Sequence, residues 1–229
     1  MTGDPLPRAT TADVRERGAR VAVLPVGSFE QHGPHLPLVT DTVVACAIAE
    51  RIAAEHPVLL LPPITISCSH EHAAWPGTVS ISARTLYAVV TDIAESLRRS
   101  GVPKLVLVNA HGGNYVLSNV VQEAEGLALF PERSDWHAAR AAAGLATSGQ
   151  SDMHAGELET SILLHVRPDL VGPDRVDHLA EDRPHLLTHG LHRYSGSGVV
   201  GRPSLASADK GRHLLDSLAG SFAGHLAAL

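Results

Sequence analysis

The chain has 229 residues, of which 44% are hydrophobic and 18% are charged. Such a composition supplies enough apolar side chains for a core, which excludes a disordered tail and a small disulfide-stapled module. Eighteen Lys and Arg against twenty-four Asp and Glu leave a formal net charge of −6, which argues against a surface that binds nucleic acid. Because no linker-like stretch separates two halves, we expect a single domain over residues 1–229.

Cysteine usage and hydropathy indicate the compartment. The two cysteines, Cys46 and Cys68, are too few for a disulfide framework, and they lie too far apart in the sequence for a CxxC metal site. Residues 1–20 carry charged side chains where a signal peptide needs an apolar run, and no later stretch approaches the ~18 apolar residues of a spanning helix. We therefore expect a cytoplasmic protein without membrane contact. The fifteen histidines, against 3% aromatic residues, still require an explanation.

The first half of the chain alternates between short buried strands and amphipathic helices. The apolar run Val21–Val26 predicts a buried strand, and a helix follows from Asp41 to Glu55, with Thr40 or Asp41 placed to cap it. The alternation continues with a strand at 58–61, a helix at 83–99, a strand at 104–109 and a helix from 114 to about 127. This order predicts an α/β fold, a mainly parallel sheet flanked by helices, with the functional side chains at the carboxyl ends of the strands.

The second half is less regular. Residues 138–149 fit a helix or a loop, residues 172–202 predict long loops over the site, and residues 207–229 predict a closing helix. The stretch 196–201 matches GxGxxG letter by letter, but Arg202 and Pro203 follow where a dinucleotide-binding fingerprint needs a helix. We interpret this stretch as a flexible loop.

Three polar side chains follow the first predicted strand. Glu30 and His32 point to the same side if the backbone stays extended, and Asp41 stands at the start of the next helix. Carboxylate and imidazole groups together suit a divalent metal such as zinc, iron or manganese. Taken singly, each residue has an ordinary explanation, Asp41 as a helix cap and the other two as polar loop residues.

Two later clusters strengthen the metal hypothesis. His111 follows the strand at 104–109 at the same sheet edge, and the two glycines after it let the backbone approach a ligand closely. The segment from His154 to Glu159 opens a helix, and buried carboxylates at a helix start need a partner. His70-Glu-His72 does not match HExxH, and it fits a solvated loop and a substrate contact equally well.

Four segments resemble, in chain order, the motifs of the creatininase family of amidohydrolases. They are GSFEQHGPHLPLVTD (27–41), WPGT (75–78), NAHGGN (109–114) and HAGELETS (154–161). The resemblance spans most of the chain and implies a three-layer α/β sandwich with two divalent metal ions, zinc and/or iron, or manganese. It implies the metal ligands Glu30, His32, Asp41 and His111, with Asp41 bridging the two ions. His154 takes the place of the family's catalytic or substrate-contacting histidine.

The chain departs from creatininase itself at Gly113, where that enzyme has a further carboxylate ligand. Glu159 and Glu157 are the candidates to replace it. On a helix they diverge by roughly 200°, and Glu159 aligns with the apolar Leu163 and Val166. An inward carboxylate is unstable without a cation. We therefore predict Glu159 as the fifth ligand and assign Glu157 to the catalytic group, as a support or substrate contact.

Within the family, the sequence looks most like the peptidases of mycofactocin maturation. This likeness implies that the chain releases the C-terminal Val-Tyr dipeptide from a modified precursor peptide, which would be its substrate partner, by means of a metal-activated water. Two alternatives stay open: an amidase that acts on a small cyclic amide or a formamide, and a catalytically silent metal-binding or scaffold protein. Creatinine is not the expected substrate, because no tryptophans surround His154.

The remaining assignments follow from the motifs. His154 is the expected proton-transfer residue, because an unperturbed pKa of ~6.5 suits both accepting and returning a proton. His72, Trp75 and Asn114 are expected to contact substrate, and His35 is interpreted as a solvated side chain. The resemblance also implies a homo-oligomer, with a hexamer as the larger assembly, and the apolar C-terminal helix offers a surface for it.

Overall fold

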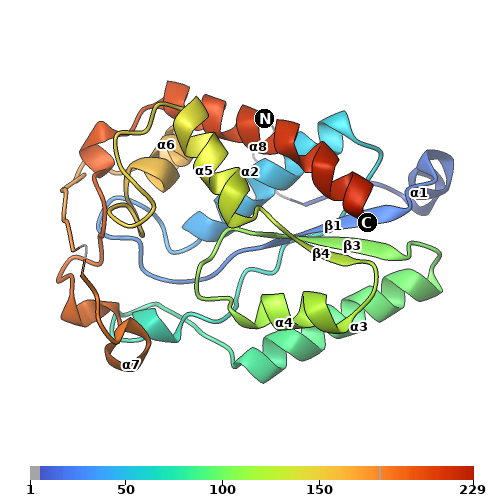
Figure 1. Cartoon of the computed structure of the whole chain (residues 1–229), viewed down its shortest axis with the longest axis horizontal. Coiled ribbons are helices and arrows are strands. Elements are labelled where there is room, and N and C mark those ends of the chain that lie inside the picture. Colours follow the sequence, from blue (N-terminus) through green and yellow to red (C-terminus); the bar gives the residue numbers. More distant parts are fainter. Residues whose placement is uncertain (1–5, 181) are drawn as a thin grey trace.

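A parallel sheet divides the molecule into two helical layers. In the computed structural model, which describes residues 6–180 and 182–229, the sheet has four strands in the order β2–β1–β3–β4 (Figure 1). Each described pair of neighbouring strands is parallel. The strands are β1 (Val21–Val26), β2 (Leu59–Leu60), β3 (Lys104–Asn109) and β4 (Leu127–Phe130). The predicted α/β class is therefore confirmed.

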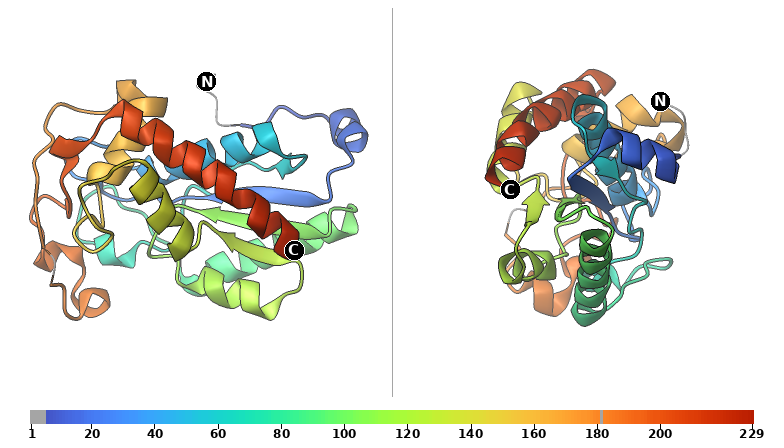
Figure 2. Two further views of the ribbon diagram at one scale, coloured as in Figure 1. Left: turned by 45° about the horizontal axis from the view of Figure 1, so that its top comes forward. Right: turned by 90° about the vertical axis from the view of Figure 1, so that its right-hand side faces the viewer.

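Helices cover both faces of the sheet (Figure 1, Figure 2). One layer contains α3 (Ala83–Arg99) and α4 (Val116–Glu123), and the other contains α2 (Thr40–Glu55), α5 (Arg133–Ala142), α6 (Glu157–Val166) and α8 (Ala208–Ala228). The other helical segments are α1 (Thr11–Arg17), α7 (Leu186–His189) and 3-10 turns at His70–His72, Pro168–Leu170, Leu191–Arg193 and Pro203–Leu205.

Alternate strand residues belong to two separate hydrophobic clusters. In β1, Val23 packs into the cluster that includes α2, α6 and α8, whereas Ala22 and Leu24 pack into the cluster that includes α3 and α4. This alternation follows from the period of two along a strand. Both faces of β1 are covered, which explains why its sequence is uniformly apolar. Phe130 and Phe222 meet edge to face in the first cluster.

The helix predicted from Asn114 to about Leu127 is shorter in the structure. It ends at Glu123, and the chain turns at Gly126, whose φ of 76° favours glycine, into strand β4. Apolar residues in this segment fit the spacing of a helix and of a buried four-residue strand alike. Periodicity alone therefore extended the predicted helix to the first residue of β4 and predicted no strand there, and this part of the prediction is wrong.

The ambiguous stretch 138–149 divides into helix and loop. Helix α5 begins with a capping box formed by Glu132 and Asp135. The first residues of the stretch complete this helix, which ends at Ala142. The loop that follows leads to α6. Residues 154–156 therefore lie between two helices of the same layer, and residues 157–159 form the first turn of the second one, α6.

The segment 172–202 forms long loops with short helical turns at the end of the molecule to which β1 leads (Figure 1). Val200 forms a bridge with His154, which joins these loops to the chain before α6. The GxGxxG-like stretch forms no helix, as expected. Val199 and Val200 are fully buried, however, so this stretch is a packed loop and the interpretation as a flexible one is wrong.

Helix α8 is the long helix predicted at the end of the chain. It packs against α2, α5 and α6, and Leu214, Leu218 and Phe222 are buried there. Because these apolar residues are covered by the chain itself, they do not supply the assembly surface that the sequence suggested. Of the helices in the described residues, none combines the length and the apolar character that a bilayer crossing requires.

Candidate metal centre

The predicted motifs meet because β1 and β3 run in register. Val26 pairs with Asn109, and the Ala110 amide donates to the Val26 carbonyl at 3.1 Å. The loops after the two strands therefore start at the same height, as expected for side chains at the carboxyl ends of parallel strands. His111 Nε2 lies 3.2 Å from Glu30 Oε2.

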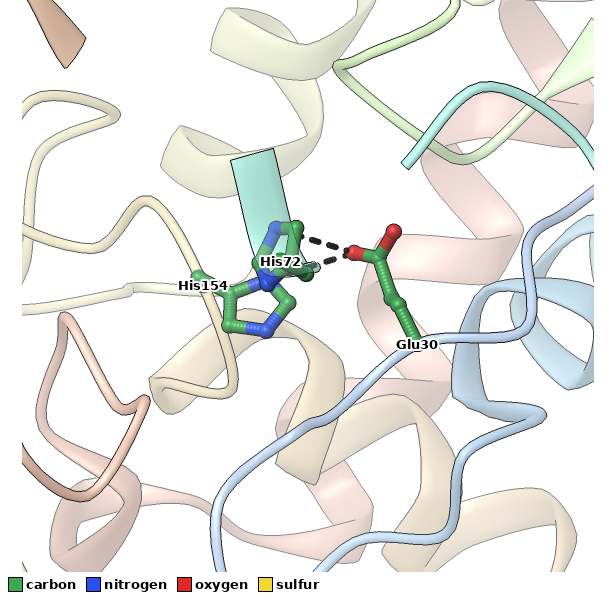
Figure 3. Close-up of side chains that lie close together, drawn as sticks. All are labelled: Glu30, His72 and His154. Atoms are coloured by element: carbon green, nitrogen blue, oxygen red, sulfur yellow. Dashed lines mark ion pairs between the residues drawn. The ribbon is translucent and has the colours of Figure 1, made fainter. Parts of the chain in front are cut away.

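Glu30 is fully buried at the centre of the cluster. Its Oε1 atom lies 3.2 Å from His72 Nε2 and 3.8 Å from His154 Nδ1, and both rings face it in Figure 3. None of these contacts has the geometry of a hydrogen bond, so among the described residues neither carboxylate oxygen has a hydrogen-bond partner. A buried carboxylate in this state needs a cation. Glu30 therefore indicates a metal ion more directly than any sequence pattern does.

His32 and His111 each donate a hydrogen bond from one ring nitrogen to a backbone carbonyl. His32 Nδ1 donates to the Glu30 carbonyl at 3.0 Å, and His111 Nε2 donates to the Cys68 carbonyl at 2.7 Å. Hydrogen bonds of this kind orient metal-binding histidines and select their tautomer. The remaining nitrogens, His32 Nε2 and His111 Nδ1, both face the carboxylate of Asp41.

Asp41 lies between the two histidines in the geometry of a bridge. Its Oδ1 atom is 3.1 Å from His32 Nε2 and its Oδ2 atom is 3.0 Å from His111 Nδ1, while Ser28 Oγ donates to Oδ2 at 2.6 Å. A nitrogen lone pair that faces a carboxylate oxygen needs a proton or a metal ion between them. Helix α2 has no side-chain cap hydrogen bond, so the interpretation of Asp41 as a helix cap is not supported.

The charges of the cluster attract a cation at these same positions. Burial alone would lower the pKa of His32, but the carboxylates around it, Asp41 foremost, raise it to about 9. The pKa of His111 is raised well above its usual value by Glu30 and Asp41, again against the effect of burial. Positive charge is thus favoured at both nitrogens that face Asp41, and a divalent ion satisfies the same attraction.

Glu159 reaches the cluster from the first turn of α6. One oxygen accepts from the Ala155 amide at 2.6 Å, and the carboxylate, a His32 nitrogen and a His154 nitrogen lie within 4.8 Å of one another. Burial raises the pKa of Glu159 to about 7, and the nearby Asp41 adds to this effect. Ala155 has a φ of 52°, in the left-handed region, where the chain turns between His154 and α6.

His154 is held as a neutral imidazole. Its Nε2 donates to the Gln31 carbonyl at 2.6 Å, which leaves the Nδ1 lone pair free to face the cluster. Its ring centroid lies 4.2 Å from that of His32 and 4.3 Å from that of His72. Burial, followed by the charges on these two rings, lowers the pKa of His154 well below its usual value. The free nitrogen suits a base or a ligand.

His72 is buried, so its interpretation as a solvated loop residue is wrong. Gln31 Oε1 accepts from the Gly33 amide at 2.9 Å, and Gln31 Nε2 donates to His72 Nδ1 at 2.9 Å. A neutral His72 therefore carries its proton on Nε2, the atom that faces Glu30. Burial lowers the pKa of His72 to about 3. Trp75 lies beside it, with 6.1 Å between ring centroids.

The structure does not bring Glu157 to the cluster. Its buried carboxylate accepts from the Ala146 amide at 3.2 Å, from the Thr147 amide and hydroxyl at 3.0 and 2.7 Å, and from Lys210 Nζ at 2.6 Å. These donors lower its pKa against the effect of burial, Lys210 first. The reason is helical geometry: Glu157 and Glu159 lie two residues apart and diverge, as the sequence indicated.

Two other predicted residues occupy structural positions. Asn114 is buried, where its Oδ1 accepts from the Cys68 amide at 3.1 Å and its Nδ2 donates to Asn109 Oδ1 at 2.9 Å. It therefore braces the loop that carries His111. His35 is only 2% exposed, so the expectation of a solvated side chain is wrong, and burial lowers the pKa of His35 to about 4.

Sequence reasoning missed two residues of the cluster. Gln31 orders both His72 and His154, and its only signal was its place between Glu30 and His32. Glu71 Oε1 lies 3.7 Å from His111 Nε2 and fills the space beside Gly113, where an added Cβ would collide with it. A carboxylate from a distant loop thus occupies the space that a side chain at 113 would need.

The match to a family model decides the class of protein. The creatininase model, described as creatinine amidohydrolase, matches residues 7–226. The chain belongs to the creatininase family. A mycofactocin precursor peptide peptidase of Mycobacterium ulcerans (strain Agy99) is 38% identical over 209 residues, 84% of this chain and 78% of the relative. Creatinine amidohydrolase of Pseudomonas putida is 30% identical over 225 residues, which cover 87% of this chain and 85% of that relative.

Solved structures agree with this assignment. A structure described as "Creatininase Mn" is 26% identical and superposes with a TM-score of 0.83 over 96% of each chain. The creatininase-family chain is thus a hydrolase of C–N bonds with the family's α/β fold. Its donor set fits divalent metal ions, because Glu30 lacks hydrogen-bond donors and Asp41 faces a ring nitrogen with each oxygen.

Proposed function

We propose that this creatininase-family chain is a metal-dependent peptidase that releases the C-terminal Val-Tyr dipeptide from a modified mycofactocin precursor peptide. The likeness to a mycofactocin precursor peptide peptidase, at 38% identity over most of both chains, supports the substrate. The orphaned buried carboxylate of Glu30, facing three histidines, carries the metal dependence.

We assign two metal positions that share Asp41. Glu30, Asp41 and His111 form one position, because an oxygen or nitrogen of each lies within 4.8 Å of the others. His32 and Glu159 form the second position with the other oxygen of Asp41. The Glu, Asp and His donors suit zinc, iron and manganese alike.

The side chains around the two positions have separate roles in proton transfer, substrate contact and loop support. Divalent ions bound there supply an activated water and polarise the scissile carbonyl. His154 accepts a proton at Nδ1 and returns it to the leaving amine, while the Gln31 carbonyl holds its ring. His72 offers Nε2–H to the bound substrate, with Trp75 beside it. Asn114 acts through the loop that carries His111.

The surroundings of the site support this division. Glu157 ties the loop before α6 to α8 through Thr147 and Lys210, so we assign it a supporting role instead of a chemical one. We also propose that the protein acts in the cytoplasm and as a homo-oligomer, as the family resemblance implies. The precursor peptide is its partner, and the net charge of −6 does not favour nucleic acid.

The proposed function is tested with a synthetic precursor peptide. We expect the metal-loaded protein to release a dipeptide that mass spectrometry identifies as Val-Tyr, and we expect chelation to abolish the reaction. Creatinine and a formamide serve as competing substrates for the amidase alternative. Hydrolysis of either one, with the peptide left intact, would contradict the proposal.

A further inference from the structure

Four buried histidines of the described chain surround the carboxylates of the site, and one of them is held differently from the other three. His32, His111 and His154 each donate one ring N–H to a backbone carbonyl, which leaves a lone pair on the second nitrogen, toward the site. A bond of this kind is the usual support of a metal-binding histidine. His72 meets a donor instead, because its Nδ1 lies 2.9 Å from the side-chain amide nitrogen of Gln31.

Two backbone groups fix which end of the Gln31 amide faces His72. Gln31 Oε1 accepts from the Gly33 amide at 2.9 Å, and Gln31 Nε2 donates to the Gly198 carbonyl at 3.2 Å. A carbonyl cannot donate and an amide N–H cannot accept, so a flipped side chain would lose both bonds. The NH₂ group therefore faces His72, whose Nδ1 has to accept. The proton of the neutral His72 ring is then on Nε2.

The loop at 196–201, whose letters match GxGxxG, supplies one of these two backbone groups. A Cβ at Gly198 would collide with the side-chain amide of Gln31, and the φ of Gly198 is 84°. Close approach and a positive φ both favour glycine. The next residues, Val199 and Val200, are fully buried. Gly198 thus lets the packed loop close over Gln31 and hold its amide in one orientation.

The position of the His72 proton matters because His72 belongs to a further group of possible metal ligands. Glu30, His72 and His154 are all buried, and one ligand atom of each lies within 4.8 Å of the others. Figure 3 shows both rings beside the Glu30 carboxylate, and His72 Nε2 lies 3.2 Å from Glu30 Oε1. A ring nitrogen that carries a proton has no lone pair for a metal ion. The proton on Nε2 therefore decides whether this group can bind one.

We propose that Gln31 keeps a metal ion out of the group of Glu30, His72 and His154 by fixing the His72 proton on Nε2, so that His72 serves the reaction as a hydrogen-bond donor. This inference rests on the proposed function, in which the metal ions share Asp41. Gln31 is a positioning residue. Its side chain makes His72 a donor toward the site, and its backbone carbonyl makes His154 an acceptor there.

Gln31→Glu tests the inference by reversing the polarity of the contact with His72. A carboxylate at position 31 accepts a proton from Nδ1, which is the arrangement that supports metal-binding histidines, and so frees Nε2. The measurement is 15N NMR of the metal-free protein with labelled histidine rings, in which His72→Ala assigns the His72 signals. We expect an unprotonated Nδ1 in the native protein and a protonated Nδ1 in Gln31→Glu. A protonated Nδ1 in the native protein would overturn the inference.

Zinc content after equilibrium dialysis tests the consequence for metal binding. We expect two zinc ions per native chain and a third in Gln31→Glu, and we expect Gln31→Glu combined with His72→Ala to lose the third. Gln122→Glu adds the same charge at an exposed position, so this matched control should bind zinc as the native protein does. Equal zinc content in Gln31→Glu and the native protein would show that the proton on His72 does not exclude metal, which contradicts the inference.

Gln31→Met provides a second variant if Gln31→Glu does not fold. It has a side chain of similar length without an N–H donor, so both neutral forms of His72 should be present in the NMR spectra of the metal-free protein. A single form with the proton on Nε2 would overturn the inference. The NMR measurement needs neither metal nor peptide. If the native protein leaves the precursor peptide intact, the proposed function fails by itself, while the proton position and the zinc content still decide the role of Gln31.

Discussion

Two buried glutamates of this chain have opposite surroundings. Glu157 receives hydrogen bonds from backbone amides, a hydroxyl and a lysine, whereas Glu30 receives none among the described residues. A satisfied carboxylate stabilises the fold, and an unsatisfied one is retained for a ligand. This contrast separates structural from metal-binding carboxylates more clearly than their positions in the motifs do.

Loss of a histidine that faces Asp41 should remove metal. We expect His32→Ala or His111→Ala to weaken metal affinity and activity together by about 10–100-fold or more, and to leave the fold intact, because both side chains lie on loops outside the hydrophobic clusters. Metal analysis and circular dichroism of the purified variants check this. Native metal content in either variant would contradict the ligand set.

His154→Ala should behave differently. The ring is oriented by the Gln31 carbonyl and offers a free Nδ1, so its loss should lower kcat by about 10²–10⁴-fold, as for a proton-transfer residue. Metal content should stay at the native level. If the metal content falls when the side chain is removed, His154 is a metal ligand, and its assignment as the proton-transfer residue is wrong.

The two glycines after His111 should differ in their tolerance of alanine. A Cβ at Gly113 would collide with His111 Nε2 and Glu71 Oε1 and would lie 2.8 Å from the Cys68 carbonyl, whereas a Cβ at Gly112 meets nothing within 4 Å. We expect Gly113→Ala to displace His111 and reduce metal affinity, and Gly112→Ala to bind metal normally. Titration with a divalent metal measures both, and equal affinities would show that the loop adapts.

At the scale of elements, α6 contributes to function and stability through different faces. Glu159 faces the proposed metal ligands, while Glu157 connects the loop at Thr147 to Lys210 on α8. The spacing of two residues on a helix requires this division. The same helix therefore presents one carboxylate that prefers a cation and one that is already paired.

Glu157→Gln should destabilise the protein by about 1.5–3 kcal/mol at neutral pH, the range for hydrogen bonds to a charged group. The folded-state pKa of Glu157 is lowered, so its contribution is complete above the unfolded pKa of ~4.3 and is lost as the pH falls through the folded pKa. Denaturant unfolding should therefore show a gap between native and variant proteins at pH 7 that narrows at acidic pH.

Glu159→Gln is the matched control for this experiment. Burial raises the pKa of Glu159 to about 7, so in the metal-free protein its charge opposes folding and the variant should be as stable as the native protein or more so. A loss of stability equal to that of Glu157→Gln would mean that the two carboxylates do not differ in role.

At the scale of the whole molecule, the sequence predicted those strands and helices whose limits depend on a local pattern of apolar residues. The strands Val21–Val26 and Lys104–Asn109 and the helix Ala83–Arg99 have the predicted limits, because continuous apolar runs and amphipathic periodicity are local properties. Strand β4 is too short to show a period of its own. The contact of Glu71 with His111 and the pairing of Arg140 with Asp152 depend on how separate loops pack, which local patterns do not encode.

The central claim is that a buried cluster holds two divalent ions that share Asp41, with Glu159 as the carboxylate that replaces a ligand at Gly113. Anomalous diffraction from crystals of the metal-loaded protein tests it most directly. We predict two metal peaks, roughly 3.5–4 Å apart as in other two-metal sites, with one Asp41 oxygen on each, Glu30 and His111 at one and His32 and Glu159 at the other. A single peak, or Glu157 bound to metal with Glu159 turned away, would contradict it.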